Sequence, residues 1–248
     1  MFDNRICSAH QPAFLPWAGY IHKLMLCDNF VFMDIAKFRK RSFMHRNMIE
    51  INSMEHFLGL KLSKNSDLLN CNEVFLSKNN ISCLDEIVAK IDHSYKKSAF
   101  KNDLDEFINF SFSSLKEFSL NHICQKQLMF FIKKFNIKIN LINESEIISL
   151  IELKKFDTSE RLLNHALKTN SAIYITGINS ENYLDVNLFK KNKILNIIQK
   201  FKYDIFQEYQ KCIKPLSIVH QISILGFKNI ENILKKKQIT KKEILKND

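Results

Sequence analysis

Glycine and proline are scarce in this chain, and three of the seven lie within one short stretch near its beginning. The 248 residues include four glycines and three prolines, yet Pro12, Pro16 and Gly19 fall within one short stretch. Proline fixes φ and removes a hydrogen-bond donor, while glycine permits conformations that other residues avoid. The stretch from His10 to Tyr20, which also holds the only tryptophan, is therefore predicted to be a rigid, shaped loop.

This loop separates a short apolar run, Ile6 to Ala9, from a helix-like run, Tyr20 to Leu26. Junctions of this kind, at the carboxyl end of a strand, are where α/β folds place binding sites. The sequence therefore favours a binding loop with His10 at the strand exit. The alternative is a loop that Phe14 and Trp17 anchor on the core without a further role.

The composition is that of an ordinary globular protein, with 46% hydrophobic and 25% charged residues. No apolar run is long enough to cross a membrane, and the N-terminus lacks the apolar segment of a signal peptide. We therefore expect a cytoplasmic protein. The six cysteines are far apart and form no Cys-x-x-Cys pair, which argues against a zinc site and a disulfide framework. We expect them to be buried apolar residues and predict no metal.

The formal net charge of +11 raises the question of nucleic-acid binding. The lysines are spread along the chain, however, and diffuse lysine is typical of a solvated surface, so nucleic acid is the less favoured partner. The few arginines are more informative. Arg39, Arg41 and Arg46 lie close together, and arginine is preferred where a planar group must bind phosphate or carboxylate. This cluster, with Lys40, predicts an anion site.

A second apolar run, Phe30 to Ile35, is typical of a buried strand. Strand, loop, helix and strand form the opening unit of a parallel sheet. Asp34 is then expected near the carboxyl end of the second strand, on the same rim as the opening loop. There it would bind an amine or a metal or act as a base, or else it would cap the following turn.

The middle of the chain is predicted to be helical. Apolar residues recur every three or four positions from about Ile81 to Phe135, and neither Gly nor Pro interrupts them. Their phenylalanines are expected to form core. We predict one α/β domain over residues 1–248, with a mostly parallel sheet flanked by helices. Its α/β parts would cover about 1–65 and 137–226, and a helical subdomain would be inserted at about 80–136.

The second half repeats the α/β pattern. Asp157 and Glu160 form a capping-box pattern ahead of a helix that should run to about Lys168. Arg161 opens this helix. The run from Ala172 to Gly177 predicts another buried strand, with Gly177 at its carboxyl end, where a ligand can approach the backbone. Ile194 to Ile198 is a further strand candidate.

Several familiar enzyme motifs are absent from the sequence. There is no dinucleotide fingerprint, P-loop, His-Glu-x-x-His or Gly-x-Ser-x-Gly. The strand, loop and helix at the start are similar in layout to nucleotidyltransferase-type folds, in which a helix N-terminus faces a nucleotide phosphate. By that analogy the loop is expected to bind a nucleotide.

The sequence resembles the WbqC-like family over almost its whole length, with the helical middle as the least constrained part. The first half of the resemblance rests on Gln11-Pro12, Pro16-Trp17, Gly19-Tyr20, Lys23, Asp28, Phe30-Val31, Asp34, Phe38, Lys40, Ser42 and Arg46-Asn47-x-Ile49. The second half adds Ser159-x-Arg161-Leu162, Tyr174-x-Thr176-Gly177, Tyr183-Leu184-Asp185, Leu216-Ser217-Ile218 and Gly226. The chain departs from the family at His220, where an acidic residue is usual, and at Leu60-Lys61-Leu62-Ser63.

The resemblance implies a role in bacterial surface polysaccharide (O-antigen, lipopolysaccharide) or related glycan synthesis. It suggests transfer of an acyl, aminoacyl or glycyl group to the amine of a nucleotide-linked sugar, with a small acyl or amino-acid donor and ATP as a candidate cofactor. The alternative is a non-catalytic nucleotide-sugar-binding or scaffold protein of the same pathway.

In this hypothesis His10 is the general base and Asp34 orients the amine. His10 is chosen because an ordinary histidine titrates near neutral pH. Phosphate would be held by Arg46, with Arg39 or Arg41 and Lys40, and Trp17 or Tyr20 would stack on a sugar or base. The other substrate-binding candidates, taken from the matching positions, are Gln11, Pro16, Gly19, Lys23, Asn47, Arg161 and Gly177.

Overall fold

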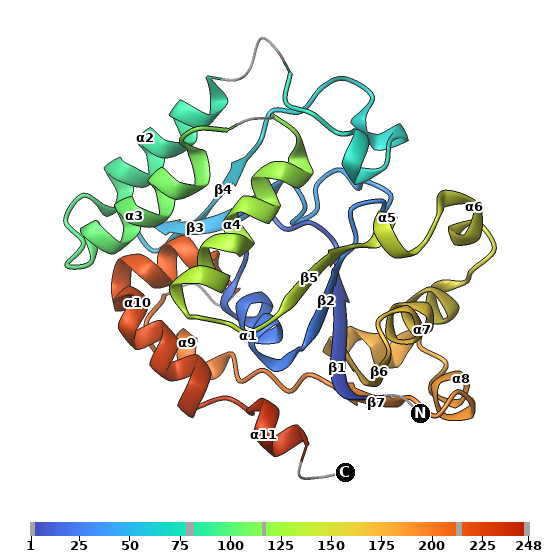
Figure 1. The fold of residues 1–248 in the computed structure, drawn as a ribbon. Helices are drawn as coiled ribbons and strands as arrows, with labels where there is room; N and C mark the ends of the chain where they lie inside the picture. The colour runs from blue at the N-terminus through green and yellow to red at the C-terminus, as the bar shows by residue number, and fades with distance from the viewer. Residues whose placement is uncertain (1–2, 78–81, 116–117, 212–214, 246–248) are drawn as a thin grey trace.

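A five-stranded parallel sheet forms the centre of the molecule (Figure 1). The computed structural model describes residues 3–77, 82–115, 118–211 and 215–245. The strands are β1 (Asp3–His10), β2 (Asn29–Phe32), β5 (Asn140–Asn143), β6 (Ser171–Thr176) and β7 (Leu195–Ile198), arranged in the order β5-β2-β1-β6-β7. All four neighbouring pairs are parallel. The predicted α/β fold with a parallel sheet flanked by helices is therefore confirmed.

The strand order reverses between β1 and β6. From β1 the chain steps to β2 and β5 on one side, and it then returns to β6 and β7 on the other. Because parallel crossovers are right-handed, the two halves place their helices on opposite faces. In such sheets ligands bind outside the carboxyl ends of the strands at the point of reversal. Here that point lies just beyond His10 and Thr176.

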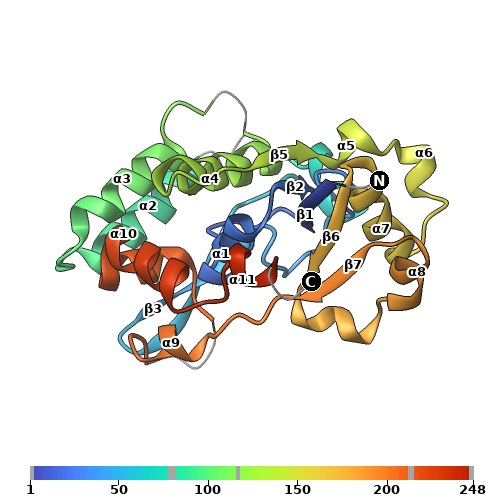
Figure 2. The same ribbon diagram turned by 60° about the horizontal axis from the view of Figure 1, so that its bottom comes forward.

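The two faces carry different helices (Figure 2). On one face α1 (Ala18–Leu26) packs against β1, α4 (Leu120–Lys134) and α10 (Ile218–Lys236). On the other face α7 (Thr158–Lys168) packs against β1 and β6, and α8 (Val186–Lys191) packs against β7. We call these the α1 face and the α7 face. The capping box predicted for Asp157 and Glu160 is present at the start of α7.

The second strand is shorter than the sequence suggested. It ends at Phe32. The Met33 amide donates the last bond of the β1–β2 ladder to the His10 carbonyl, 3.0 Å away, and the Asp34 amide then turns back to donate to the Phe32 carbonyl at 2.8 Å. The amide of Ala36 then donates to the Met33 carbonyl and closes a turn. Asp34 therefore lies on this turn, just beyond the strand and at the predicted rim of the sheet.

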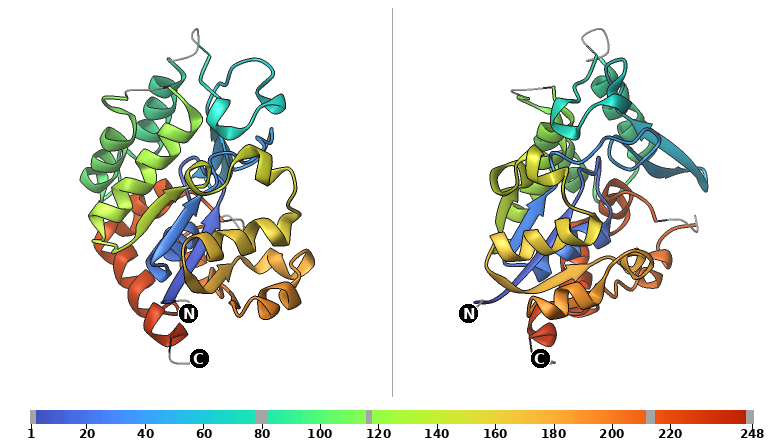
Figure 3. Two further views of the ribbon diagram at one scale, coloured as in Figure 1. Left: turned by 45° about the vertical axis from the view of Figure 1, so that its right-hand side comes forward. Right: turned by 90° about the vertical axis from the view of Figure 1, so that its right-hand side faces the viewer.

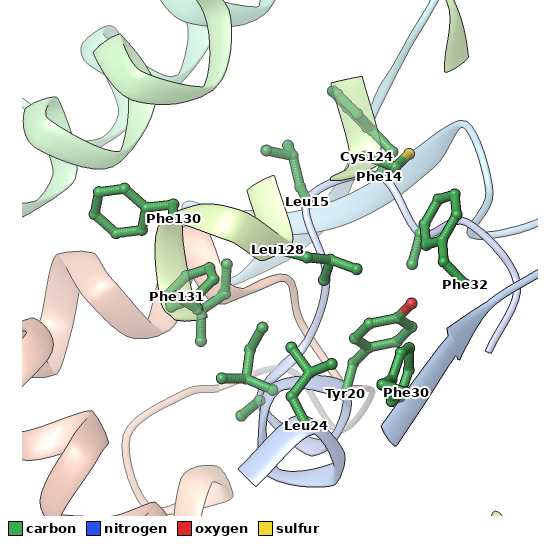
Figure 4. Close-up of a cluster of buried hydrophobic side chains, with 14 of the residues drawn as sticks. Phe14, Leu15, Tyr20, Leu24, Phe30, Phe32, Cys124, Leu128, Phe130 and Phe131 are labelled. Atoms are coloured by element: carbon green, nitrogen blue, oxygen red, sulfur yellow. The ribbon is translucent and has the colours of Figure 1, made fainter. Parts of the chain in front are cut away.

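Three helices follow one another between the hairpin and β5: α2 (Cys83–Tyr95), α3 (Lys101–Phe112) and α4. Their phenylalanines form core as predicted, since Phe107, Phe130 and Phe131 are at most 3% exposed. They belong to the same hydrophobic cluster as Phe30 of the sheet. Figure 4 shows Phe130 and Phe131 of α4 within one cluster that also contains Tyr20, Leu24 and Phe30.

A separate antiparallel hairpin consists of β3 (Arg46–Ile51) and β4 (Met54–Gly59). Its two-residue turn, Asn52-Ser53, has φ of 50° and 64°, the left-handed pair that tight hairpins require. The apolar residues from Ile49 to Leu60 thus belong to the end of one strand, the whole of the next and the residue after it. After the hairpin, the chain from 60 to 77 lies above the carboxyl ends of the sheet strands (Figure 3, cyan).

Short elements complete the fold. They are η1 (Ser66–Leu68), η2 (Cys71–Glu73), α5 (Glu144–Ile147), α6 (Leu150–Leu153), η4 (Ile178–Asn182), α9 (Asp204–Gln207) and α11 (Lys241–Ile244). The five described cysteines are free and buried, and Cys212 lies outside the described residues. No helix in the described part of the chain is long and apolar enough to span a membrane.

Candidate functional site

The loop after β1 is held rigidly by side chains from distant segments. Leu15 has a left-handed φ of 46°, which a branched residue rarely adopts. Its amide donates to Gln127 Oε1 at 2.7 Å, and Asn47 Nδ2 donates to its carbonyl at 2.6 Å. The amide of Phe14 donates to the Phe43 carbonyl at 3.0 Å. Asn47, predicted to bind substrate, is 1% exposed and therefore supports the loop from behind.

Three aromatic rings meet at the carboxyl end of β1. The centroid of the His10 ring lies 4.5 Å from that of Tyr20 and 5.3 Å from that of Trp17, both edge to face. His10 Nδ1 lies 2.8 Å from the Gln11 carbonyl, which fixes the ring and leaves Nε2 free to accept a hydrogen bond. Tyr20 is buried, whereas Trp17, His10 and Gln11 remain partly exposed. The loop thus presents a histidine and an indole at the reversal point.

Lys23 is the cation of this region. It lies in the second turn of α1 and is 6% exposed. Its Nζ lies 3.8 Å from the position that a Cβ on Gly177 would take, and that Cβ would meet no other atom within 4 Å. Among the described residues, no acid or carbonyl lies within bonding distance of this ammonium. We call His10, Gln11, Trp17, Lys23 and Gly177 the switch-point site.

Burial changes the titration of both ionisable groups at this site. Burial lowers the pKa of Lys23 from 10.5 to about 8. Burial, followed by the nearby Lys23 charge, lowers the pKa of His10 from 6.5 to about 3, although its bond to the Gln11 carbonyl works in the opposite direction. Both causes favour the neutral imidazole over the imidazolium, so His10 is a weaker base than an ordinary histidine.

Asp34 lies at the predicted rim, but its carboxylate is occupied. Oδ1 accepts from the amide of Ser145 at 2.9 Å, and Oδ2 accepts from the Ser145 hydroxyl at 2.5 Å. Its carbonyl accepts from Asn121 Nδ2 at 3.1 Å. Asp34 is 7% exposed. The sequence allowed two roles for Asp34, a ligand or base at the site and a cap of the following turn. The geometry matches a cap, but the element that Asp34 caps is helix α5, which is distant in the chain.

Arg161 lies on the α7 face, away from Lys23. Its Nε donates to Glu144 Oε1 at 2.6 Å, and its Nη2 bonds the other carboxylate oxygen. His165 Nε2 lies 2.8 Å from Glu144 Oε1, and His165 Nδ1 lies 3.2 Å from the Tyr174 hydroxyl. Glu144 and His165 are fully buried. Burial raises the pKa of Glu144, but the bonds from His165 and Arg161 outweigh it and lower that pKa overall.

The basic cluster predicted to hold phosphate has its own contacts. Arg46 Nη2 donates to the Arg41 carbonyl at 2.8 Å, and its guanidinium lies 4.2 Å above the Phe57 ring. Lys40 Nζ pairs with Asp67 at 2.8 Å on the surface. No described contact joins Arg46 or Lys40 to His10 or Lys23. The described side-chain contacts of Arg46 and Lys40 are thus with Arg41, Phe57 and Asp67, although Asn47, next to Arg46, bonds the loop itself.

Two supporting residues were missed. Gln199 follows β7 and donates from Nε2 to the Gly19 carbonyl at 2.9 Å, which ties the segment after β7 to the start of α1. Gln127 is fully buried and supports Leu15. Gln127 did leave a signal, since it is a polar residue within the apolar stripe of α4. Gln199 left none, because its partner is a backbone carbonyl of a remote helix.

No group of three or more His, Cys, Asp or Glu side chains in the described ranges is arranged to hold a metal ion. The chain matches no curated protein and no solved structure. A family model does match, over residues 11–232, and this range includes the opening loop, Lys23, the buried Glu144 network and Gly177. Because the match covers most of the 248 residues, the chain belongs to the WbqC-like protein family.

Proposed function

We propose that the protein transfers an acyl or aminoacyl group to the amine of a nucleotide-linked amino sugar in bacterial surface glycan synthesis. The nucleotide phosphate would bind at the switch-point site. One observation carries this proposal: the buried Lys23 ammonium has no partner among the described residues. An unpaired buried charge is costly, and a phosphate oxygen would supply the missing charge-assisted bond.

The start of α1 supports the same ligand. Trp17 occupies the N-cap position and makes no side-chain cap, and the first turn contains no acidic residue. The amides of Ala18 and Gly19 therefore remain available, and the helix dipole favours an anion there. Gly177 leaves open space beside Lys23 Nζ. The partly exposed Trp17 ring offers a stacking surface for the base or the sugar.

The chemistry requires one proton to move. The amine nitrogen attacks the carbonyl carbon of an activated acyl donor, such as a thioester or an acyl phosphate. A C–N bond forms, the leaving group departs with its bonding electrons, and the nitrogen loses a proton. Neutral His10, with Nε2 free, is the proton acceptor in this proposal. Asp34 acts as a positioning residue, because Ser145 occupies both carboxylate oxygens. ATP would serve only to activate the donor.

Calorimetric titration with UDP-glucosamine, which carries a diphosphate and a free amine, tests the binding step. We expect Lys23→Met, nearly the same size but uncharged, to weaken binding by about tenfold or more, as loss of a charge-assisted bond does. Lys61→Met is the matched control, because Lys61 is exposed and pairs with Glu86. If wild type and K23M bind UDP-glucosamine with equal affinity, the phosphate does not bind at this site.

Binding without catalysis is the second candidate function, and the low pKa of His10 favours it. An imidazole with a pKa of about 3 is a weak base at neutral pH. Incubation of the purified protein with UDP-glucosamine, amino acids and ATP, followed by mass spectrometry, separates the two. An aminoacylated sugar that His10→Gln fails to form supports the transferase. Tight binding without product across the donors supports the binding protein.

A further inference from the structure

A second concave region lies beside the hairpin, apart from the switch-point site. It is a cavity of about 300 Å³, which is within the range of small-molecule sites. Its apolar walls are Phe38, Leu60 and Leu62, and its polar lining is Lys40, Arg41, His45, Ser63 and Ser66. We call this cavity the Arg41 pocket.

The charged lining of the Arg41 pocket is basic. Lys40 Nζ bonds Asp67 at 2.8 Å, so one of its cations already has a partner. The Arg41 guanidinium, by contrast, makes no hydrogen bond or ion pair with any described residue. His45 is half-buried, with Nδ1 3.4 Å from the Ser42 carbonyl. A free guanidinium beside an apolar wall suits an anion that carries an organic body.

The backbone of this wall is fixed in an uncommon shape. Arg41 has a left-handed φ of 59°, which few residues other than glycine adopt. Its carbonyl accepts from Arg46 Nη2 at 2.8 Å, and the Ser42 hydroxyl donates to the Arg39 carbonyl at 2.6 Å. Such conformations persist where the surroundings enforce them, and they gather at binding sites. The turn therefore holds the Arg41 side chain on the rim of the cavity.

The same segment also reaches the switch-point site. The Phe43 ring lies 5.8 Å from the Trp17 ring, and the Phe43 carbonyl accepts from the amide of Phe14. Residues 38–46 thus line the Arg41 pocket and, through Phe43, contact the loop of the switch-point site. A transfer reaction needs two neighbouring substrates, and this arrangement provides for both.

We propose that the Arg41 pocket binds the phosphate ester of the acyl donor, with its organic body on Phe38, Leu60 and Leu62. That the bound ligand is the acyl donor rests on the proposed transferase function. That the pocket binds a phosphate ester does not depend on that function. A phosphate ester of this kind could come from a nucleotide or from a pantetheine phosphate. The two share the group that Arg41 would bind and differ in the body that the apolar wall would contact.

Calorimetric titration with AMP, with pantetheine 4′-phosphate and with inorganic phosphate tests this inference. We expect an organic phosphate to bind more tightly than inorganic phosphate, and the tighter of the two esters identifies the source. Arg41→Asn is the test variant, because asparagine tolerates the left-handed conformation. It should weaken binding by about tenfold or more. Arg39→Asn is the matched control, since Arg39 is exposed, carries the same charge and does not line the cavity.

Several outcomes would overturn the Arg41 pocket: no binding of either ester, equal weakening by R41N and R39N, or equal affinity for the esters and inorganic phosphate. Lys23→Met separates this inference from the proposed function. If K23M loses UDP-glucosamine but keeps the ester, the two sites are independent and both proposals stand. If K23M loses both ligands, there is a single site and the Arg41 pocket is wrong. If K23M keeps both, the switch-point proposal fails while the pocket survives.

Discussion

The two faces of the sheet each bury a charge, and they treat it in opposite ways. On the α7 face, Glu144 is fully buried and receives bonds from Arg161 and His165. On the α1 face, Lys23 is almost as buried, yet its ammonium has no partner among the described residues. A satisfied buried charge serves the fold, whereas an unsatisfied one lowers stability and is retained where function requires it. This contrast supports the proposal that the α7 face has a structural role and that the ligand binds on the α1 face.

The largest effect is expected at Glu144. Glu144→Ala leaves Arg161 and the buried His165 without their carboxylate, and breaking a buried pair in this way costs about 3–5 kcal/mol. Urea unfolding monitored by circular dichroism measures this loss. Glu86→Ala is the control, because Glu86 and its partner Lys61 are both about half exposed, and it should change little. A loss below about 1 kcal/mol in E144A would mean that the network does not stabilise the fold.

Substitution of Lys23 should raise the free energy of unfolding, whereas substitution of Glu144 should lower it. Burial of its charge lowers the pKa from 10.5 to about 8, a difference that corresponds to about 3 kcal/mol of unfavourable burial at neutral pH. We therefore expect Lys23→Met to stabilise the ligand-free protein by up to about 3 kcal/mol while it weakens nucleotide-sugar binding. The same urea experiment at pH 7 measures the stability. A destabilised K23M would show that Lys23 contributes to the fold and would end the contrast with Glu144.

The smallest effect concerns the histidines. Burial lowers the pKa of His10 on the α1 face, with Lys23 adding to the shift, and burial also lowers the pKa of His165 on the α7 face. Below the unfolded value of 6.5, the unfolded chain binds protons that these buried imidazoles do not, so stability falls as pH falls. Each histidine contributes up to about 1.4 kcal/mol per pH unit until its folded pKa is reached.

Thermal unfolding between pH 7 and pH 4.5 measures this slope, and replacement of either histidine by asparagine should flatten it. A bound phosphate would raise the pKa of His10 more than that of His165, because only His10 adjoins the proposed anion site. With saturating nucleotide sugar, H10N and wild type should therefore show the same slope of stability against pH. The slope of H165N should still differ from that of wild type. An equal response of both variants to the ligand would contradict the assignment of the site to the α1 face.

Much of the fold could be predicted from the sequence, because its signals are local. The apolar run before His10, the capping box at Asp157 and the buried run that ends at Thr176 each depend on neighbouring residues. The helical stripes of the middle segment follow the same logic. The end of β2 was misplaced, since the apolar run continues through a turn in which the amides of Asp34 and Ala36 bond the carbonyls of Phe32 and Met33. The proposed division at about 65, 80 and 136 remains a prediction.

Only part of the candidate site could be predicted from the sequence. The amino-acid sequence by itself indicated a shaped loop after His10, because proline fixes its own φ wherever it occurs. The structure ends that loop at Trp17, since α1 begins at Ala18. Tertiary structure decided its companions. It brought Gly177 to Lys23, placed Arg161 on the opposite face, put Arg46 at the start of the hairpin and paired Lys40 with Asp67. The reason is physical: the partner and the burial of a charge depend on segments that the fold, not the chain order, makes neighbours.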